Sequence, residues 1–198
     1  MIEIYTDGSA SKNRSGWGFV VLVDGIKVFE KSGTEHKGDT NQRMEIIAAM
    51  EACEWASNSD YIQDHDVTIY SDSAYVINCF KDKWFINWEN NGWKNTKGET
   101  IANILEWKCL IKFFKMPNFN FEKVKGHSGH IYNERADALA QGKIQPDENT
   151  YLTNNKKNDT IYIEVSEIFL NYAMKKITIK DAVTRVVEII KREGNIDE

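Results

Sequence analysis

Two short stretches of the 198-residue sequence share one pattern: residues 4–9 (Ile-Tyr-Thr-Asp-Gly-Ser) and residues 69–74 (Ile-Tyr-Ser-Asp-Ser-Ala). Each is an apolar run that ends in a hydroxyl residue and a carboxylate, as at the end of a strand. If the two strands are parallel neighbours, strand alternation places Asp7 and Asp72 side by side at one edge of a sheet. Two adjacent anions repel each other unless a cation joins them. The pattern therefore indicates a cation site, although an Asp before Gly or Ser is usually only a turn residue.

The residues around the first stretch predict an antiparallel start to the sheet. Residues 2–6 alternate in character and contain β-formers, which predicts a strand. Residues 17–23 and 26–32 are two further β-rich runs, and Asp24-Gly25 between them is a strong two-residue hairpin signal. We therefore expect three consecutive strands here.

Helices and strands alternate in the rest of the first 143 residues. Thr40 is a suitable N-cap for a helix that runs to about Ser57. Val67–Ser71 predicts a short strand that has no hairpin partner beside it. The other expected elements are helices over 74–80, 101–114 and 133–141 and a strand over 118–124. Three strands followed by alternating helices and strands predict a mixed α/β sheet flanked by helices.

The C-terminal part of the chain has a different pattern. Residues 144–159 contain Pro-Asp-Glu-Asn and a polar run, which predicts a linker. Residues 160–172 carry apolar residues at helical spacing, and Thr178 with Asp181 three residues later resembles a capping box that begins a second helix. We expect a C-terminal helical hairpin within residues 160–198. Its apolar stripes pack on its own domain or mediate self-association or binding of a protein partner.

Composition limits the class of protein. The net charge of −5, from 25 basic and 30 acidic residues, excludes a histone-like mode of nucleic-acid binding. The three cysteines show no CxxC spacing, which argues against a zinc site or disulfide framework and favours a reducing compartment. The N-terminus lacks a signal peptide's apolar run, and no stretch approaches the ~18 apolar residues of a membrane span. We expect a soluble, cytoplasmic protein with no membrane partner.

Two further carboxylates and a histidine loop are candidate site residues. Glu45 follows a polar run on the first helix, and Asp137 lies in an alanine-rich helix. Each, taken alone, is of a kind that usually faces solvent. Residues 125–130 (Lys-Gly-His-Ser-Gly-His) place His127 between glycines, which favours a mobile loop that swings an imidazole toward Asp137. The alternative is a polar turn whose histidines face water.

Four segments taken together resemble the successive signatures of type 1 ribonuclease H. They are residues 5–9 (Tyr-Thr-Asp-Gly-Ser), 40–45 (Thr-Asn-Gln-Arg-Met-Glu), 70–73 (Tyr-Ser-Asp-Ser), and 126–130 (Gly-His-Ser-Gly-His) followed by 133–137 (Asn-Glu-Arg-Ala-Asp). The resemblance covers residues 1–143 and implies a catalytic domain with a ribonuclease-H-like five-stranded mixed sheet of order 3-2-1-4-5.

The resemblance also implies an activity and a metal site. The implied activity is endonucleolytic hydrolysis of the RNA strand of RNA–DNA hybrids, which leaves a 5′-phosphate and a 3′-hydroxyl. Asp7, Glu45, Asp72 and Asp137 match the family's metal-holding carboxylates, which implies two Mg²⁺ ions with Mn²⁺ as a substitute. Phosphodiester cleavage by two metal ions ~4 Å apart needs oxygen ligands and no His/Cys cage. His127 matches the family's mobile histidine, which assists proton transfer or product departure.

Further residues match family positions that contact the hybrid. Those assigned to 2′-hydroxyls and the minor groove are amides, which both donate and accept: Asn13, Asn41 and Gln42. Thr40 and Asn103 match a pocket for a DNA-strand phosphate. The segment 81–97 resembles a basic protrusion that binds the DNA strand, and its assigned residues are Trp84, Trp88 and Thr96. Aromatic residues interleaved with cations suit sugar and phosphate contacts, although tryptophans here also suit a small core under a loop.

Two other functions stay open from the sequence. One is a non-catalytic hybrid-binding or scaffold module that retains the fold. The other is a different ribonuclease-H-like two-metal nuclease, such as a junction resolvase or an integrase-type enzyme. Retention of all four carboxylates favours an enzyme, because a binding module has no need for concentrated negative charge facing phosphate.

Overall fold

The computed structural model describes residues 1–63, 65–126, 128–147, 168 and 178–194. The chain divides into two compact units, Met1–Glu148 and Asn149–Glu198.

A five-stranded mixed sheet forms the centre of the first unit, with strand order β3-β2-β1-β4-β5. Its antiparallel part comprises β1 (Ile2–Ala10), β2 (Ser15–Val23) and β3 (Ile26–Glu35). The parallel strands β4 (Val67–Ser71) and β5 (Phe119–Lys123) extend the sheet from β1. The predicted order and the mixed pairing are confirmed.

Strand β1 is longer than the expected 2–6. It pairs with β2 as far as Ala10–Ser15, whereas its parallel ladder with β4 ends at Thr6–Ser71. Asp7 therefore lies inside β1 rather than at its end, because the antiparallel partner keeps the backbone extended beyond the last pair with β4. The expected hairpin between β2 and β3 is confirmed, with positive φ at both Asp24 (50°) and Gly25 (81°) as a type I′ turn requires.

Two of the expected helices begin as predicted. Helix α1 (Asn41–Asn58) starts at Thr40, whose Oγ1 accepts a hydrogen bond from the Arg43 N–H at 3.2 Å. Helix α2 (Ala74–Lys81) is capped by Ser73. The short 3-10 helix η1 (Asp60–Gln63) and helix α3 (Trp84–Asn90) were not predicted.

The other two helix boundaries were wrong by a few residues. Helix α4 (Ile104–Phe114) begins later than the expected 101, because the Ile101 N–H donates to Trp93 O and Asn103 has a left-handed backbone with φ 58°. Helix α5 (Ile131–Ala140) begins two residues earlier than the expected 133. The hydrogen bond between Ile101 and Trp93 in the loop sets the start of α4, and helical periodicity in the sequence does not predict such a contact.

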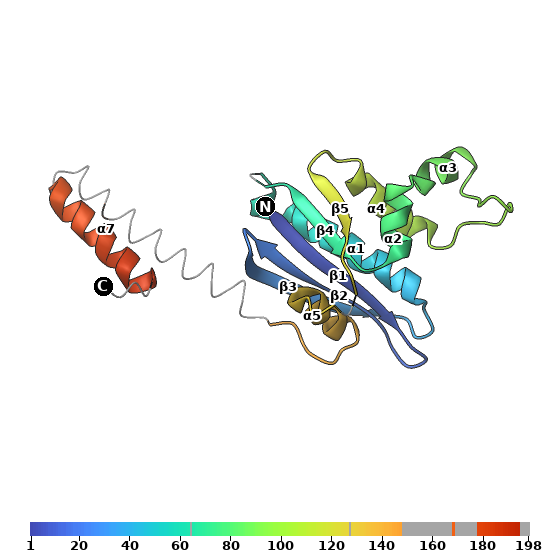
Figure 1. Ribbon diagram of the computed structural model, residues 1–198, viewed down its shortest axis with the longest axis horizontal. Coiled ribbons are helices and arrows are strands. Elements are labelled where there is room, and N and C mark those ends of the chain that lie inside the picture. The colour runs from blue at the N-terminus through green and yellow to red at the C-terminus, as the bar shows by residue number, and fades with distance from the viewer. Residues whose placement is uncertain (64, 127, 148–167, 169–177, 195–198) are drawn as a thin grey trace. The chain divides into compact units, whose positions relative to one another are not determined.

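The sheet carries a hydrophobic core on each face. On one face, Ile4, Phe19 and Ile69 pack with α1 and with Trp107 of α4. On the other, Tyr5, Val20 and Leu22 pack with Ala136 and Leu139 of α5, the helix that covers this face of the sheet (Figure 1). Helix α5 lies very close to β2, because a Cβ on Gly18 would stand only 2.6 Å from Leu139 Cβ. The two cores therefore fix α1 and α5 on opposite faces of β1.

The second unit contains helix α7 (Ile179–Gly194). The expected capping box is present, since the Thr178 N–H and hydroxyl donate to Asp181 Oδ2 at 3.1 and 2.7 Å. Ala182 and Ile189 are buried together with Ile168. The expected first helix over 160–172 lies outside the described residues, apart from Ile168. Among the helices that the structure describes, none has the length and apolar character needed to cross a bilayer.

Candidate active site

Three carboxylates from separate elements meet at the end of the β1–β4 ladder. Asp7 comes from β1, Glu45 from the second turn of α1, and Asp72 directly follows β4. One oxygen from each lies within 4.8 Å of the other two. The ladder explains the pairing of the two aspartates, because each is the next residue after the last parallel pair, Thr6–Ser71. The strands are therefore the parallel neighbours on which the sequence hypothesis depended.

Two glycines allow the chain to approach this cluster. A Cβ on Gly8 would lie 2.2 Å from the backbone N of Glu45, so any side chain there would push α1 away from β1. A Cβ on Gly126 would lie 2.4 Å from Asp72 Oδ2. Gly8 had no predicted role, and Gly126 was predicted only as one of the two glycines of a mobile loop around His127. A glycine directly after a strand carboxylate is the signal that indicates such an approach.

The cluster concentrates negative charge away from water. Burial, and then the charge of Asp72, raises the pKa of Asp7 from 3.8 to about 8. Burial and the charges of Asp7 and Asp72 likewise raise the pKa of Glu45 well above its ordinary value. Hydrogen bonds from Gly8 offset only part of this cost. Among the described residues, none hydrogen-bonds the buried Glu45 Oε2.

Asp137, the fourth carboxylate of the predicted set, contacts the cluster through Asp7. It hydrogen-bonds the Asp7 carboxyl group and adds to the rise in the Asp7 pKa. It also accepts a hydrogen bond from Gln141, the residue directly after α5. Asp137 is half-buried and is not one of the three residues whose oxygens lie within 4.8 Å of one another.

The predicted catalytic histidine, His127, lies outside the described residues. The loop that follows it is anchored at two points. The Gly129 N–H donates to Glu134 Oε1 at 3.0 Å, and the His130 ring stacks on Tyr5 with centroids 4.5 Å apart. Tyr5 stacks in turn on Tyr70, with centroids 4.8 Å apart. These rings tie the start of α5 to the two strands that carry Asp7 and Asp72.

The residues assigned to the RNA strand and to a phosphate are largely exposed. Asn13 lies in the β1–β2 loop, and Asn41 and Gln42 begin α1. The Asn41 Oδ1 accepts a hydrogen bond from the Ala10 N–H at 2.6 Å, which fixes the amide and leaves its NH₂ group as a donor. Thr40 is exposed as well as being the cap of α1, and Asn103 is half-buried at the start of α4.

The aromatic segment forms a pocket of about 690 Å³. Trp84, Trp88 and Thr96, all predicted to bind substrate, are among its lining residues. The lining also includes amides and a cation that were not predicted to bind substrate: Asn87, Asn91, Lys94 and Asn95. The pocket therefore combines aromatic faces with hydrogen-bond donors.

Of the two tryptophans predicted to bind substrate, one lies in the core and the other is partly exposed. Trp88 is only 8% exposed and packs in the main core, where its ring meets Trp107 edge-on at 5.4 Å. Trp84 is half-buried and contacts Trp88 with a centroid separation of 6.3 Å. Trp88 thus supports the pocket from beneath, while Trp84 presents more of its ring to solvent.

Comparisons with known proteins give a consistent result. The RNase H family model matches residues 1–145. Ribonuclease H from Syntrophomonas wolfei is 45% identical over 146 residues, which is 73% of this chain and 96% of that protein. A foamy viral protease-reverse transcriptase solved with an RNA/DNA hybrid is similar with a TM-score of 0.61 and 26% identity, over 71% of this chain and 19% of that one. LC9-RNase H1, a type 1 RNase H with the type 2 active-site motif, has a TM-score of 0.59 and 25% identity, over 73% and 74% of the two chains.

Proposed function

The chain belongs to the RNase H family, and we propose that it cleaves the RNA strand of RNA–DNA hybrids internally, using two divalent metal ions. The products would carry a 5′-phosphate and a 3′-hydroxyl. The observation that carries this proposal is the convergence of Asp7, Glu45 and Asp72, with Asp137 beside Asp7. The hybrid-bound foamy viral relative supports the choice of substrate.

The cluster fits a hard divalent cation. Its donors are all carboxylate oxygens, which Mg²⁺ prefers, with Mn²⁺ as a substitute. Glu45 Oε2 is buried without a hydrogen-bond partner among the described residues, and it would gain one ligand interaction from a cation. The raised pKa values of Asp7 and Glu45 show that their negative charge is poorly compensated. Magnesium bound by Asp7, Glu45, Asp72 and Asp137 would supply an activated water and charge stabilisation for the leaving 3′-oxygen.

The protein's own groups would orient the hybrid around this cluster. Asn13, the Asn41 NH₂ group and Gln42 are exposed donors suited to the 2′-hydroxyls that distinguish RNA from DNA. Thr40 and Asn103 would hold a DNA-strand phosphate. Trp84, Trp88 and Thr96 line the pocket suited to the DNA strand, since sugars pack on aromatic faces.

Proton transfer is assigned to His127 by sequence alone. Its loop joins β5 to α5 and passes Asp72 at Gly126, where a side chain would collide with the carboxylate. An imidazole titrates near neutral pH and so can donate a proton to the leaving 3′-oxygen or assist product departure.

The proposal also covers the domain organisation and the location of the protein. We assign residues 1–143 to the catalytic domain, 144–159 to a linker and 160–198 to a helical extension that mediates self-association or binds a partner. The three cysteines are free thiols, which is consistent with a cytoplasmic location.

The test is cleavage of a strand-labelled hybrid by the full chain in Mg²⁺. Duplex RNA, duplex DNA and single strands serve as substrate controls, and EDTA and Asp7→Asn serve as controls for the site. We expect only the hybrid's RNA to be cut, with 5′-phosphate ends, and no cutting in EDTA or by the variant. Binding of hybrid without cleavage in Mg²⁺ or Mn²⁺ would instead support a scaffold. Cleavage of a DNA junction would support a different two-metal nuclease.

A further inference from the structure

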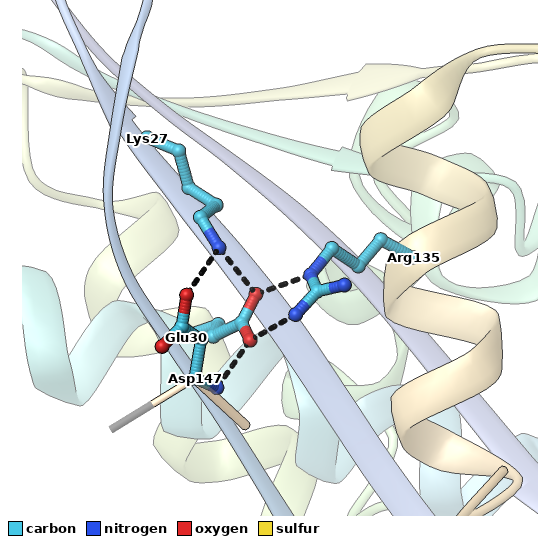
Figure 2. A network of polar contacts seen from close by, with 4 residues as sticks. All are labelled: Lys27, Glu30, Arg135 and Asp147. Carbon is cyan, nitrogen blue, oxygen red and sulfur yellow. Dashed lines mark hydrogen bonds and ion pairs between the residues drawn. The ribbon is translucent and has the colours of Figure 1, made fainter. Parts of the chain in front are cut away.

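A buried carboxylate on β3 forms the centre of a polar network away from the cluster (Figure 2). The side chain of Glu30 is fully buried, and Arg135 of α5 binds it with two parallel hydrogen bonds of 2.6 Å. The Asp147 N–H donates to the same carboxylate, and Lys27 approaches it at 3.3 Å. Glu30 therefore joins three separate segments: β3, α5 and the chain just after α5.

Burying the Glu30 carboxylate costs free energy of hydration. A buried carboxylate loses its hydration, and an apolar residue of similar size is often at least as stable in such a place. Burial alone would raise the pKa of Glu30, but the hydrogen bonds from Arg135 and Asp147 keep it below its ordinary value. Glu30 is thus a buried, charged residue whose carboxylate oxygens accept hydrogen bonds from Arg135 and Asp147. The next residue, Lys31, instead pairs with Glu51 at the surface.

Besides the Glu30–Arg135 pair, close packing on β2 and the His130–Tyr5 stack at its start hold helix α5 on the sheet. Its buried residues are mainly small, and its first residue, Ile131, is 69% exposed. The N-cap residue, His130, makes no capping hydrogen bond with its side chain. The buried Ala136, Leu139 and Ala140 bring α5 close to the sheet through apolar contacts that are not directional. The bidentate pair supplies the directional contact that these residues lack.

The position of Arg135 on α5 links this anchor to the carboxylate cluster. Arg135 and Asp137 are two residues apart, which places them about 200° apart around the helix axis. Arg135 reaches β3 on one side of α5, and Asp137 reaches Asp7 of β1 on the other. A turn of α5 about its axis would therefore move Asp137 relative to Asp7.

We propose that the Glu30–Arg135 pair is a positioning device that sets Asp137 against Asp7 for metal binding. Glu30 and Arg135 are positioning residues, since neither touches the cluster. This inference rests on the proposed function in one respect only, that the cluster binds Mg²⁺. The Asp147 N–H completes the anchor, so the segment directly after α5 contributes to the same alignment.

The test compares Glu30→Gln and Arg135→Lys with the full-length wild-type protein. Glu30→Gln removes the charge that pairs with the guanidinium. Arg135→Lys keeps the charge of α5 but loses the two parallel bonds, and its site is one-third exposed, so it is the milder change. Lys27→Gln is the matched control, because it removes a cation from the same carboxylate without touching α5.

Mg²⁺ binding is measured by isothermal titration calorimetry in the absence of nucleic acid. Hybrid cleavage is then measured as a function of Mg²⁺ and of hybrid concentration. We expect the Mg²⁺ dissociation constant to rise about 10-fold in Glu30→Gln, as for other groups that orient metal ligands, and less in Arg135→Lys. Cleavage should recover at high Mg²⁺ with little change in KM for the hybrid, and Lys27→Gln should match the wild type.

The outcomes separate the two proposals. If folded Glu30→Gln or Arg135→Lys binds Mg²⁺ as tightly as the wild type and is merely less heat-stable, the pair is only structural and the inference is overturned. If Glu30→Gln does not fold, Arg135→Lys decides alone. If the wild type itself binds no Mg²⁺, the proposed function fails and the inference fails with it.

Discussion

Replacing Asp7 by Asn should stabilise the metal-free protein while it abolishes cleavage. Burial and the neighbouring Asp72 raise the pKa of Asp7 to about 8, so the folded protein holds a proton that the unfolded chain releases near pH 4. Between about pH 4 and about pH 8 the folded state thus binds more protons than the unfolded state. The free energy of unfolding falls as pH rises through this window.

The magnitude follows from the shift. A rise from 3.8 to about 8 corresponds to a loss of up to about 6 kcal/mol of stability by pH 8, and of about 2 kcal/mol by pH 5. Asn does not titrate, but it weakens the hydrogen bond shared with Asp137, which costs about 1 kcal/mol or more. We therefore expect Asp7→Asn to unfold with a free energy about 5 kcal/mol higher than the wild type at pH 8, and about 1 kcal/mol higher at pH 5.

Urea denaturation in EDTA at pH 5, 6.5 and 8 measures this difference. A parallel series in Mg²⁺ should narrow the gap at pH 8, because a ligand that binds only the folded wild type stabilises it by mass action. An Asp7→Asn variant that is less stable than the wild type at pH 8, or a difference that does not change with pH, would refute the electrostatic reasoning.

Three further predictions compare single substitutions in pairs. Trp88→Ala removes a core side chain and should lower the free energy of unfolding by about 3–5 kcal/mol in urea denaturation, whereas Trp84→Ala should mainly weaken hybrid binding, by about 10-fold in fluorescence anisotropy. Gly8→Ala should lower kcat about 100-fold in steady-state assays, because its Cβ displaces Glu45, while Ser9→Ala should not. Thr40→Val should cost about 1 kcal/mol in thermal denaturation through the lost cap, and Thr40→Ser should restore it.

Much of the fold could be predicted because local signals and hydrophobic pattern agree. Asp24-Gly25 specifies a turn with two positive φ angles, and Thr40 caps α1 through its hydroxyl. The repeated Ile-Tyr-hydroxyl-Asp pattern predicted adjacent aspartates on the condition that the two strands are parallel neighbours, and the register, which pairs Tyr5 with Tyr70, meets that condition. In each case a few adjacent residues carry the whole signal.

The errors arose where distant residues decide the outcome. Strand β1 extends past Thr6 because β2, a separate segment, pairs with its second half. Helix α4 begins late because Ile101 bonds to Trp93 across a loop. In the sequence, Trp88 is one of several tryptophans in a segment that also contains lysines, and only the tertiary contact with Trp107 places it in the core.

In the candidate site, too, the residue types could be predicted from the sequence, whereas their arrangement depends on distant contacts. The types and order of Asp7, Glu45 and Asp72 are visible in the sequence, but their convergence depends on the β1–β4 ladder and on the close approach at Gly8. The Glu30–Arg135 pair was not predicted, because a Glu next to a lysine on a strand usually faces solvent. Its burial depends on a partner 105 residues away in the chain.

Anomalous diffraction from crystals soaked in Mn²⁺ tests the central claim most directly, because it locates bound metal without relying on activity. We expect Mn²⁺ peaks about 2.2 Å from carboxylate oxygens of Asp7, Glu45 and Asp72, and none at this place in Asp7→Asn crystals. Saturating Mn²⁺ with no peak at these three residues, or with peaks only elsewhere, would contradict the assignment of the cluster as the metal site.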